Sequence, residues 1–309
     1  MKKFLLPIIL CLALGVRAQN YEFLPYGNMD SWAVRNIKEA GLLGGKTKQL
    51  YMIARRESVD GDRYKRGDSP WSTSNAYAHA LGANKVSVSV TPERRGSGYC
   101  CRMETRLDTI SAAGVKLYAL VTGSVYTGIL ADPVTMKHSG DPNSAIDSGM
   151  PFTKRPKAFV FDYKAHIEQG QMVRANASRH VHKLEGRDAG MVIVILQHRW
   201  EEDGHIYAYR VGTAGEYLGR STNGWVTNHS LPIEYKEPSS SAKHPCAKLF
   251  TNRYKALNSK GKMVHIEELG WRGDLAPTHL IVQISSSCQK PFSGCPGNVV
   301  WCDNLRMEY

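Results

Sequence analysis

The sequence predicts an all-β fold, a jelly-roll β-sandwich of two antiparallel sheets with long decorating loops. Apolar and polar residues alternate in many short runs, which is the pattern of strands with one buried face. Clusters of Gly, Pro, Asn and Asp separate these runs and indicate turns. Helical periodicity is scarce, and we expect one short helix, over residues 246–258. Roughly nine short strands with turns between them favour two packed sheets.

The clearest strand lies at residues 85–91, where three valines share one face and two serines share the other. Similar runs rich in β-branched and aromatic residues occur at 99–107, 115–120, 158–167, 191–200, 205–212, 225–235, 279–285 and 299–309. Asp203-Gly204 predicts a hairpin, because this pair readily takes the positive φ values of a tight turn. Residues 20–68 are turn-rich and basic, and we expect them to decorate the sheet edges.

The first 18 residues predict a signal peptide. Lys2 and Lys3 precede an apolar run over residues 4–15, and Ala18 supplies the small residue of a cleavage site. The run is shorter than the ~20 apolar residues of a transmembrane helix. We therefore expect an exported protein, in the periplasm, at the cell surface or secreted, without a transmembrane anchor. Residues 19–309 are then expected to form a single jelly-roll domain.

The composition is that of a folded, basic protein. Hydrophobic residues make up 42% and charged residues 22% of 309 residues, which excludes intrinsic disorder. Lys and Arg total 40 against 28 Asp and Glu, a formal net charge of +12. Such a surface can attract nucleic acid, anionic lipid or acidic polysaccharide. Because the leader predicts export, we do not expect nucleic acid as a partner.

The cysteines that remain after removal of the leader are even in number, which permits disulfides in an exported chain. They are Cys100, Cys101, Cys246, Cys288, Cys295 and Cys302. Cys288 and Cys295 flank a turn segment and are the easiest pair to imagine. Cys100 and Cys101 are adjacent, so they should point to opposite faces of a strand and cannot both serve one site. The sequence contains no Cys-x-x-Cys pattern, so the cysteines do not indicate a zinc site.

Two predicted strands carry side chains suited to glycan recognition. On one, Arg102, Glu104 and Arg106 share a face, and on a later one Gln197 and Arg199 follow an apolar run. Planar guanidinium, carboxylate and amide groups can make forked hydrogen bonds to paired hydroxyls. The alternative is a solvated sheet face on which Arg and Glu pair with each other.

Trp71 is the best candidate for an aromatic platform. It lies in the polar segment 69–75, which shows no apolar periodicity and ends at Asn75, a further candidate contact. A flat aromatic ring can stack on the apolar C–H face of a sugar. The alternative is that Trp71, like most tryptophans in a protein of this size, packs in the core.

Hydrolysis of a glycosidic bond would need two carboxyl groups ~5–9.5 Å apart. Glu104, Asp162 and Glu201 lie on or beside predicted strands, so the candidate catalytic pairs are Glu104 with Asp162 and Glu104 with Glu201. Sequence spacing does not fix these distances. Binding and hydrolysis therefore both stay open.

Six segments carry a family resemblance, in order along nearly the whole mature chain. They are LPYGNMDSW (24–32), GGKTKQLY (44–51), SPWSTSN (69–75), PERRGSGYC (92–100), GMPFTKRPK (149–157) and the closing WCDNL (301–305). Together they resemble the putative carbohydrate metabolism domain family of gut Bacteroidetes, and the last is similar to the final strand of carbohydrate-binding jelly rolls. The resemblance implies a β-jelly roll with a role in glycan metabolism. Members have been called glycoside hydrolases, but the resemblance supplies no catalytic pair.

Jelly rolls of this kind often hold one calcium ion between the first and last strands. Asn28, Asp30 and Asp303 could supply oxygen ligands of the type that Ca²⁺ prefers. The alternative is that Asp303 caps a turn or pairs locally. No other cofactor is expected.

The sequence as a whole predicts an exported protein that binds a polysaccharide or oligosaccharide. The alternatives are a glycoside hydrolase and a structural protein of a surface glycan-uptake assembly. Arginines recur in the segments of interest, at positions 94, 95, 102, 106, 155 and 199. Guanidinium groups match carboxylates and sulfates, so we expect a preference for acidic glycans. The alternative is that the excess cations are scattered over the surface.

Overall fold

The computed structural model describes residues 20–41, 45–61, 64, 67–80, 83–112, 115–138, 141–239 and 243–309. Within these ranges the regular structure is almost entirely β, with short 3-10 helices at Met136–His138 and Pro142–Ala145. The predicted all-β sandwich is therefore confirmed. The predicted leader lies outside the described residues. None of the described helices is long and apolar enough to cross a membrane.

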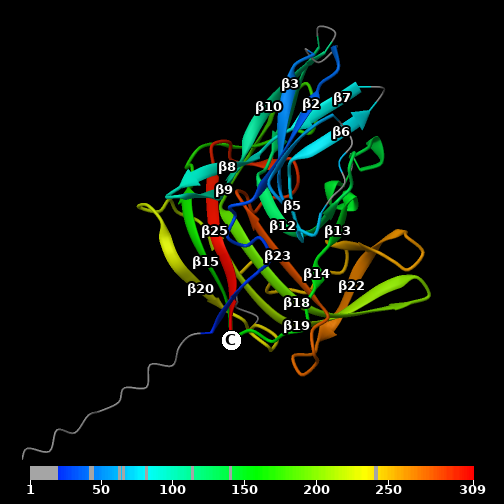
Figure 1. The fold of residues 1–309 in the computed structure, drawn as a ribbon, viewed down its shortest axis with the longest axis vertical. Coiled ribbons are helices and arrows are strands. Elements are labelled where there is room, and N and C mark those ends of the chain that lie inside the picture. The colour runs from blue at the N-terminus through cyan, green and yellow to red at the C-terminus, as the bar shows by residue number, and fades with distance from the viewer. Residues whose placement is uncertain are drawn as a thin grey trace, which may run out of the picture.

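Two sheets form the body of the molecule (Figure 1). The first sheet has the strand order β20 (Val226–Pro232), β15 (Ala158–His166), β25 (Val299–Glu308), β9 (Gly98–Glu104) and β8 (Val90–Arg95), with β1 (Tyr21–Phe23) on β25. The second has the order β13 (Ile146–Ser148), β12 (Ser124–Leu130), β23 (His279–Ser285), β18 (Gly190–Glu202), β19 (His205–Leu218), β22 (Met263–Trp271) and β21 (Lys255–Leu257). Two short strands, β5 (Trp71–Thr73) and β14 (Met150–Pro151), pair with β12 and β23. Within these two sheets every described strand pair is antiparallel except β19 with β22, which is parallel.

The main core lies between the two sheets. Phe159 and Phe161 of the first sheet pack in one cluster with Val192, Val194 and Leu196 of the second. The residues between these on β18 face outward but are also buried, in a second cluster beneath the segment that contains Cys246 and Phe250. This explains why β18 is apolar without alternation, since both of its faces are covered.

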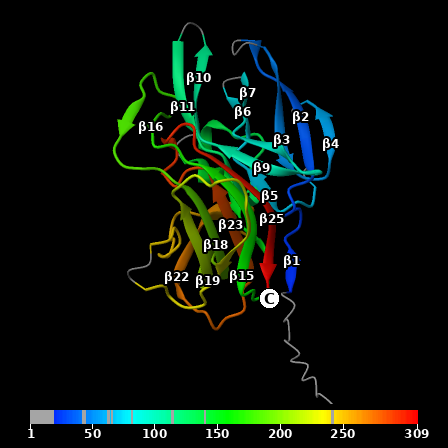
Figure 2. The ribbon, with the colours of Figure 1, turned by 90° about the vertical axis from the view of Figure 1, so that its left-hand side faces the viewer.

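Three groups of strands project from one end of the sandwich (Figures 1 and 2). They are β2 (Trp32–Lys38), β3 (Thr47–Ile53) and β4 (Glu57–Asp60); β6 (Ala76–Ala80) and β7 (Ala83–Ser87); and β10 (Arg106–Ala112) and β11 (Val115–Val121). A fourth small sheet contains β16 (Met172–Arg174), β17 (His182–Leu184) and β24 (Ser293–Gly294). The predicted strands at 85–91 and 99–107 are each divided in two, because the chain passes between the sandwich and these projections there. Thr105 marks one division: its N–H donates to Asn298 rather than to a strand partner.

The prediction of a helix over residues 246–258 is wrong. Apart from β21 the segment is irregular, and its backbone groups bond to side chains of the second sheet. Phe250 N–H donates to the Glu268 carboxylate, and the Cys246 carbonyl accepts from Arg210. Tertiary hydrogen bonds thus replace the i→i−4 bonds that a helix would need.

Candidate functional site

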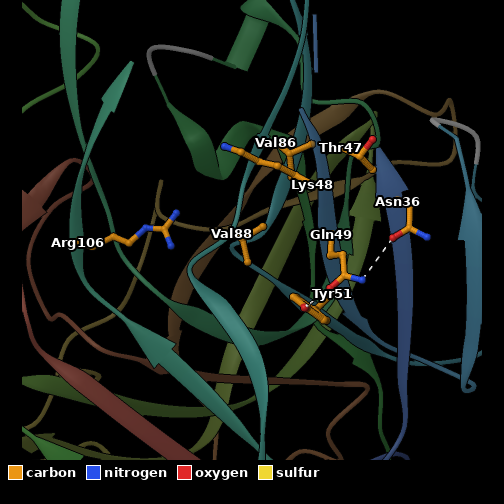
Figure 3. A pocket seen from close by; sticks show the side chains of 8 residues that line it. All are labelled: Asn36, Thr47, Lys48, Gln49, Tyr51, Val86, Val88 and Arg106. Atoms are coloured by element: carbon orange, nitrogen blue, oxygen red, sulfur yellow. Dashed lines mark hydrogen bonds between the residues drawn. The ribbon is translucent and has the colours of Figure 1, made fainter. Parts of the chain in front are cut away.

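An open pocket of about 680 Å³ lies between the paired strands β2 and β3 on one side and β7 and β10 on the other (Figure 3). The side chains that line it are mostly polar: Asn36, Thr47, Lys48, Gln49, Tyr51, Val86, Val88 and Arg106. Its volume falls within the roughly 300–1,000 Å³ of small-molecule sites. Arg106 is the member of this lining that the sequence predicted as a glycan contact.

One wall of the pocket is built by strand alternation and register. Thr47, Gln49 and Tyr51 lie on one face of β3, because side chains alternate across a strand. Leu50 points to the other face and is buried. Asn36 on β2 is the register partner of Gln49, so it joins the same face.

Hydrogen bonds fix this wall as a row of polar groups. The Tyr51 hydroxyl donates to Gln49 Oε1 at 2.7 Å, and Gln49 Nε2 donates to Asn36 Oδ1 at 3.5 Å. Asn36 Nδ2 then donates to Asp60 Oδ1 at 2.8 Å. The two amides and the tyrosine are therefore oriented before any ligand arrives, which lowers the entropic cost of binding.

Arg106 faces this row from the opposite side of the pocket (Figure 3). Its Nε and Nη2 donate to the two carboxylate oxygens of Asp108, at 2.7 and 3.1 Å. The arginine side chain nevertheless remains 36% exposed. A guanidinium held along one edge keeps the donors of its other edge for a ligand.

Glu39 bonds to two residues of the pocket lining, Val86 and Lys48, without entering the lining itself. Its carboxylate accepts from the Val86 N–H at 3.0 Å and pairs with Lys85 and Lys48 at 3.2 and 3.3 Å. Burial opposes its ionisation, but the Val86 hydrogen bond and the two ammonium groups outweigh burial and lower the pKa of Glu39. The described lining itself contains no carboxylate.

Trp71 and Asn75 are both interior residues, which corrects their prediction as exposed contacts. Trp71 is 2% exposed, and its indole N–H donates to the Pro25 carbonyl at 2.7 Å. A ring covered to this extent offers no face to a sugar. The Asn75 side chain donates to the Val90 carbonyl and accepts from the N–H groups of Ser89 and Val90. The polar character of segment 69–75 therefore reflects buried hydrogen bonds.

Arg102 and Glu104 lie on the outer face of the first sheet, away from the pocket lining. Arg102 Nη1 donates to Glu104 at 2.8 Å, and Arg102 Nε lies 3.4 Å from Glu93. The side chains of Arg102 and Glu104 are both partly exposed. This is the arrangement of the alternative prediction, a solvated sheet face with paired charges.

Gln197 and Arg199 belong to a buried polar cluster of the second sheet. Gln197 is 1% exposed and donates to Glu268 Oε1 at 2.6 Å. Arg199 Nε donates to Gln197 Oε1 at 2.7 Å, and Arg199 Nη1 donates to the Ser148 carbonyl at 2.8 Å. Arg199 Nη2 is buried and has no hydrogen-bond partner among the described residues. Neither Gln197 nor Arg199 lines the pocket with Arg106, so the structure does not bring the two predicted halves of the glycan site together.

The candidate catalytic carboxylates are not brought together. Glu104 lies opposite Val299 of β25, and Asp162 lies opposite Asp303 four residues further along that strand. This places the two Cα atoms about 13 Å apart along the strands and about 10 Å apart across them, which exceeds the ~5–9.5 Å of a glycosidase pair. Each carboxylate is bonded to a different arginine, Glu104 to Arg102 and Asp162 to Arg95. Glu201, at the tip of the β18–β19 hairpin, lies on the opposite side of the molecule from β9 (Figure 1).

Asp162 and Asp303 instead share the guanidinium of Arg95. Arg95 Nη2 donates to Asp162 at 2.8 Å, and Nη1 donates to Asp303 at 2.6 Å. The Trp225 ring lies 3.9 Å from the guanidinium carbon. Asp162 also accepts from the Asn228 N–H at 2.8 Å. A side-chain cation therefore bridges these carboxylates.

Asn28 and Asp30, the other candidate calcium ligands, make bonds within the protein. Asp30 accepts from Asn28 Nδ2 at 3.1 Å and from the Tyr99 N–H at 2.8 Å. Asp303 accepts from the Asn304 N–H as well as from Arg95, as the alternative of local pairing predicts. In the described part of the chain, no group of three or more His, Cys, Asp or Glu side chains could hold a metal ion.

Sequence reasoning missed Asn36, Gln49 and Tyr51. They lie within residues 20–68, which the sequence predicts only to decorate the sheet edges. The alternation of Thr47, Gln49 and Tyr51 with Leu50 was a readable strand signal. Their meeting with Asn36 and Arg106 depends on strand register and on a distant hairpin, which the sequence does not display.

The chain was compared with curated proteins, with solved structures and with protein-family models. No curated protein matches the chain. A solved structure of a putative glycoside hydrolase from Bacteroides thetaiotaomicron is similar over 89% of this chain and 70% of that chain, at 15% identity and a TM-score of 0.47. Another, of a putative glycoside hydrolase from Bacteroides vulgatus, covers 93% and 94% at 13% identity and a TM-score of 0.45. Similarity this low carries no argument about activity.

The family model gives the assignment. The model of the putative carbohydrate metabolism domain matches residues 45–308. The match spans most of the chain and includes the pocket residues of β3, β7 and β10. This protein therefore belongs to the putative carbohydrate metabolism domain family.

Proposed function

We propose that this protein binds glycans in the pocket between β2–β3 and β10, and that it favours acidic glycans. The observation that carries the proposal is the fixed row of Tyr51, Gln49 and Asn36 facing Arg106 across an open space. Amides pair with hydroxyls as both donor and acceptor, and a tyrosine ring gives an apolar surface to the C–H face of a sugar.

The charges of the pocket support an acidic ligand. Arg106 and Lys48 line it, whereas their carboxylate partners Asp108 and Glu39 lie outside the lining. A carboxylate or sulfate of the ligand would meet cations and amide donors and no lining carboxylate. Guanidinium groups match such anions in a forked geometry.

The same lining favours binding over hydrolysis. A glycosidase needs a general acid and a second carboxylate at the scissile bond. The described lining offers Asn, Thr, Lys, Gln, Tyr, Val and Arg side chains. Membership of this family is compatible with glycan binding and with glycan hydrolysis, so it does not decide between the two functions. We therefore place this protein among recognition proteins.

The proposal also places the protein outside the cytoplasm, in the periplasm, at the cell surface or secreted. It rests here on the predicted leader of residues 1–18. A polysaccharide or oligosaccharide is then the partner, and a surface glycan-uptake assembly is the setting in which such binding would be used.

We expect acidic polysaccharides to retard the protein in affinity gel electrophoresis more strongly than neutral ones. The probes are a polyuronate, a sulfated glycosaminoglycan and a neutral glucan, each measured across a salt series. Retardation by the acidic probes should fall as salt rises past ~0.15 M, because screening weakens exposed ionic contacts. Equal retardation by neutral and acidic probes at every salt concentration would refute the acidic preference. No retardation by any probe, with the protein folded by circular dichroism, would refute glycan binding.

A further inference from the structure

We propose that Cys101 and Cys302 form a disulfide that joins β9 to β25 in an oxidising compartment. The two cysteines are register partners on these neighbouring antiparallel strands. Both are fully buried and belong to the core between the two sheets. This inference is independent of the glycan pocket.

The geometry of the pair suits a disulfide. Directly opposite residues of antiparallel strands have Cα atoms about 4.5–5.5 Å apart. That separation lies within the ~4.4–6.8 Å found across disulfides. The side chains of Cys101 and Cys302 both belong to the core cluster between the two sheets.

The neighbouring cysteine Cys100 is directed elsewhere. The Cys100 side chain lies on the outer side of β9, and its thiol donates to the Glu93 carbonyl at 3.4 Å. This is the opposite orientation expected for adjacent residues of one strand. Cys246 is likewise buried, and its thiol donates to the Ala214 carbonyl at 2.9 Å.

Cys288 and Cys295, the pair suggested by the turn between them, make separate contacts. The Cys288 thiol lies 3.6 Å from Asp188 Oδ1, and the Cys295 thiol lies 3.9 Å from the Pro296 carbonyl. Both thiols are therefore engaged by oxygen atoms. Cys101 and Cys302 are the pair that the strand register places face to face.

Oxidation of the two thiols transfers two electrons from this protein to a partner disulfide by thiol–disulfide exchange. The thiolate of one cysteine attacks the disulfide of a periplasmic-type oxidoreductase and forms a mixed disulfide. The second thiolate displaces the oxidoreductase sulfur, so the sulfur–sulfur bond forms in this protein. Two electrons leave with the oxidoreductase, which is released as a dithiol, and the two thiol protons complete the balance.

Burial dictates when this reaction takes place. Both thiols are inaccessible in the folded chain, and burial raises the pKa of Cys302 well above its ordinary value. Exchange must therefore occur during folding, before the last strand closes the first sheet. Once formed, the bond is shielded from reductants. It closes a loop of roughly 200 residues and secures β9, the strand that leads into Arg106.

The test is to map the bond in the full chain, recovered from the periplasm of an expression host. The protein is denatured and alkylated without reduction, and then digested with chymotrypsin. Cleavage after Tyr99 and Trp301 separates Cys302 from Cys288 and Cys295. We expect a cross-linked pair of peptides that begin at Cys100 and Cys302, lighter by two hydrogens than the sum of the two thiol peptides.

Variants assign the bond to one of the adjacent cysteines. The cross-link should persist in Cys100→Ser and disappear in Cys101→Ser. Alkylation of both Cys101 and Cys302 without prior reduction would overturn the proposal, as would a cross-link that requires Cys100. If a variant fails to fold, fragment-ion spectra of the wild-type cross-linked peptides still decide, because the alkylated thiol should be Cys100 and the cross-linked one Cys101.

Thermal unfolding gives a second readout. Cys302→Ser should lower Tm by about 10 °C, and refolding under reducing conditions should lower the wild-type Tm to a similar value. The same reducing treatment should leave the Tm of Cys302→Ser unchanged. Cys246→Ser, a buried cysteine whose thiol contacts a carbonyl, is the matched control and should keep its sensitivity to reduction.

Discussion

Replacement of Arg95 by methionine is expected to lower the free energy of unfolding by about 3–5 kcal/mol. The guanidinium bridges Asp162 and Asp303, both of which are buried. Methionine keeps much of the side-chain volume against Trp225 but leaves two carboxylates without their cation. Removal of one partner from a buried ion pair leaves an uncompensated charge, which is far more costly than loss of an exposed pair.

The pH dependence of this loss follows from the pKa values. Burial opposes ionisation of Asp162, but hydrogen bonds from Asn228, Asn304 and Arg95 outweigh it and lower its pKa. At Asp303 burial prevails over the same guanidinium and raises the pKa. Without Arg95 both folded-state pKa values should lie above their unfolded values. The destabilisation is then complete above the raised values and relieved as the pH falls through them. The loss measured by urea unfolding should therefore shrink between pH 7 and pH 4.

Arg94→Met is the matched control for this prediction. Arg94 is the preceding residue of the same strand, is exposed and lies 4.7 Å from the ring of Tyr99. Its replacement should cost less than about 1 kcal/mol. Equal losses of unfolding free energy in the two arginine variants would contradict the prediction, because the bridge between Asp162 and Asp303 would then stabilise the fold no more than an exposed arginine does.

Replacement of Arg210 by methionine should destabilise the second sheet by a similar amount, about 3–5 kcal/mol. Arg210 and Glu268 both have fully buried side chains, and Arg210 Nε donates to Glu268 Oε1 at 2.6 Å. Glu268 also accepts from Gln197 and from the Phe250 N–H. The single variant would leave this carboxylate buried without its cation.

The double variant Arg210→Met/Glu268→Leu separates lost charge pairing from lost packing. Replacement of both charges by apolar groups of similar size removes the unpaired carboxylate but also the acceptor of Gln197 and of the Phe250 N–H, so we expect part of the lost stability to return. The exposed pair of Arg272 and Asp274 is the control, and Arg272→Met should cost less than about 1 kcal/mol. A double variant less stable than Arg210→Met would contradict the account.

The strands were largely predictable because their patterns are local. Residues 279–285 coincide with β23, and 158–167 differ from β15 by one residue, since each alternates or is continuously apolar over its full length. The helix over 246–258 failed because Phe250 and Cys246 bond to Arg210 and Glu268 of distant strands. No local pattern records such partners.

The site was predictable only in part, for the same reason. Arg106 reaches the pocket as an exposed residue at a strand end, which its charge suggested. Gln197 carries an equally polar side chain, but it is buried and donates a hydrogen bond to Glu268, 71 positions away. Trp71 stands in a polar segment whose hydrogen bonds are satisfied inside the protein. Burial of a polar residue depends on partners that lie far off in the sequence.

The central claim is that glycans bind in the pocket of Gln49 and Arg106 and not on the outer face of the first sheet. The most direct measurement is isothermal titration with a uronate oligosaccharide on wild type, Gln49→Ala, Arg106→Ala and Arg102→Ala. Loss of a charge-assisted hydrogen bond typically costs about 1.5–3 kcal/mol, so Arg106→Ala should raise Kd by roughly tenfold or more. Gln49→Ala should raise Kd by a smaller factor, and Arg102→Ala should leave Kd unchanged. A large loss of affinity in Arg102→Ala, with Arg106→Ala binding like wild type, would contradict the claim.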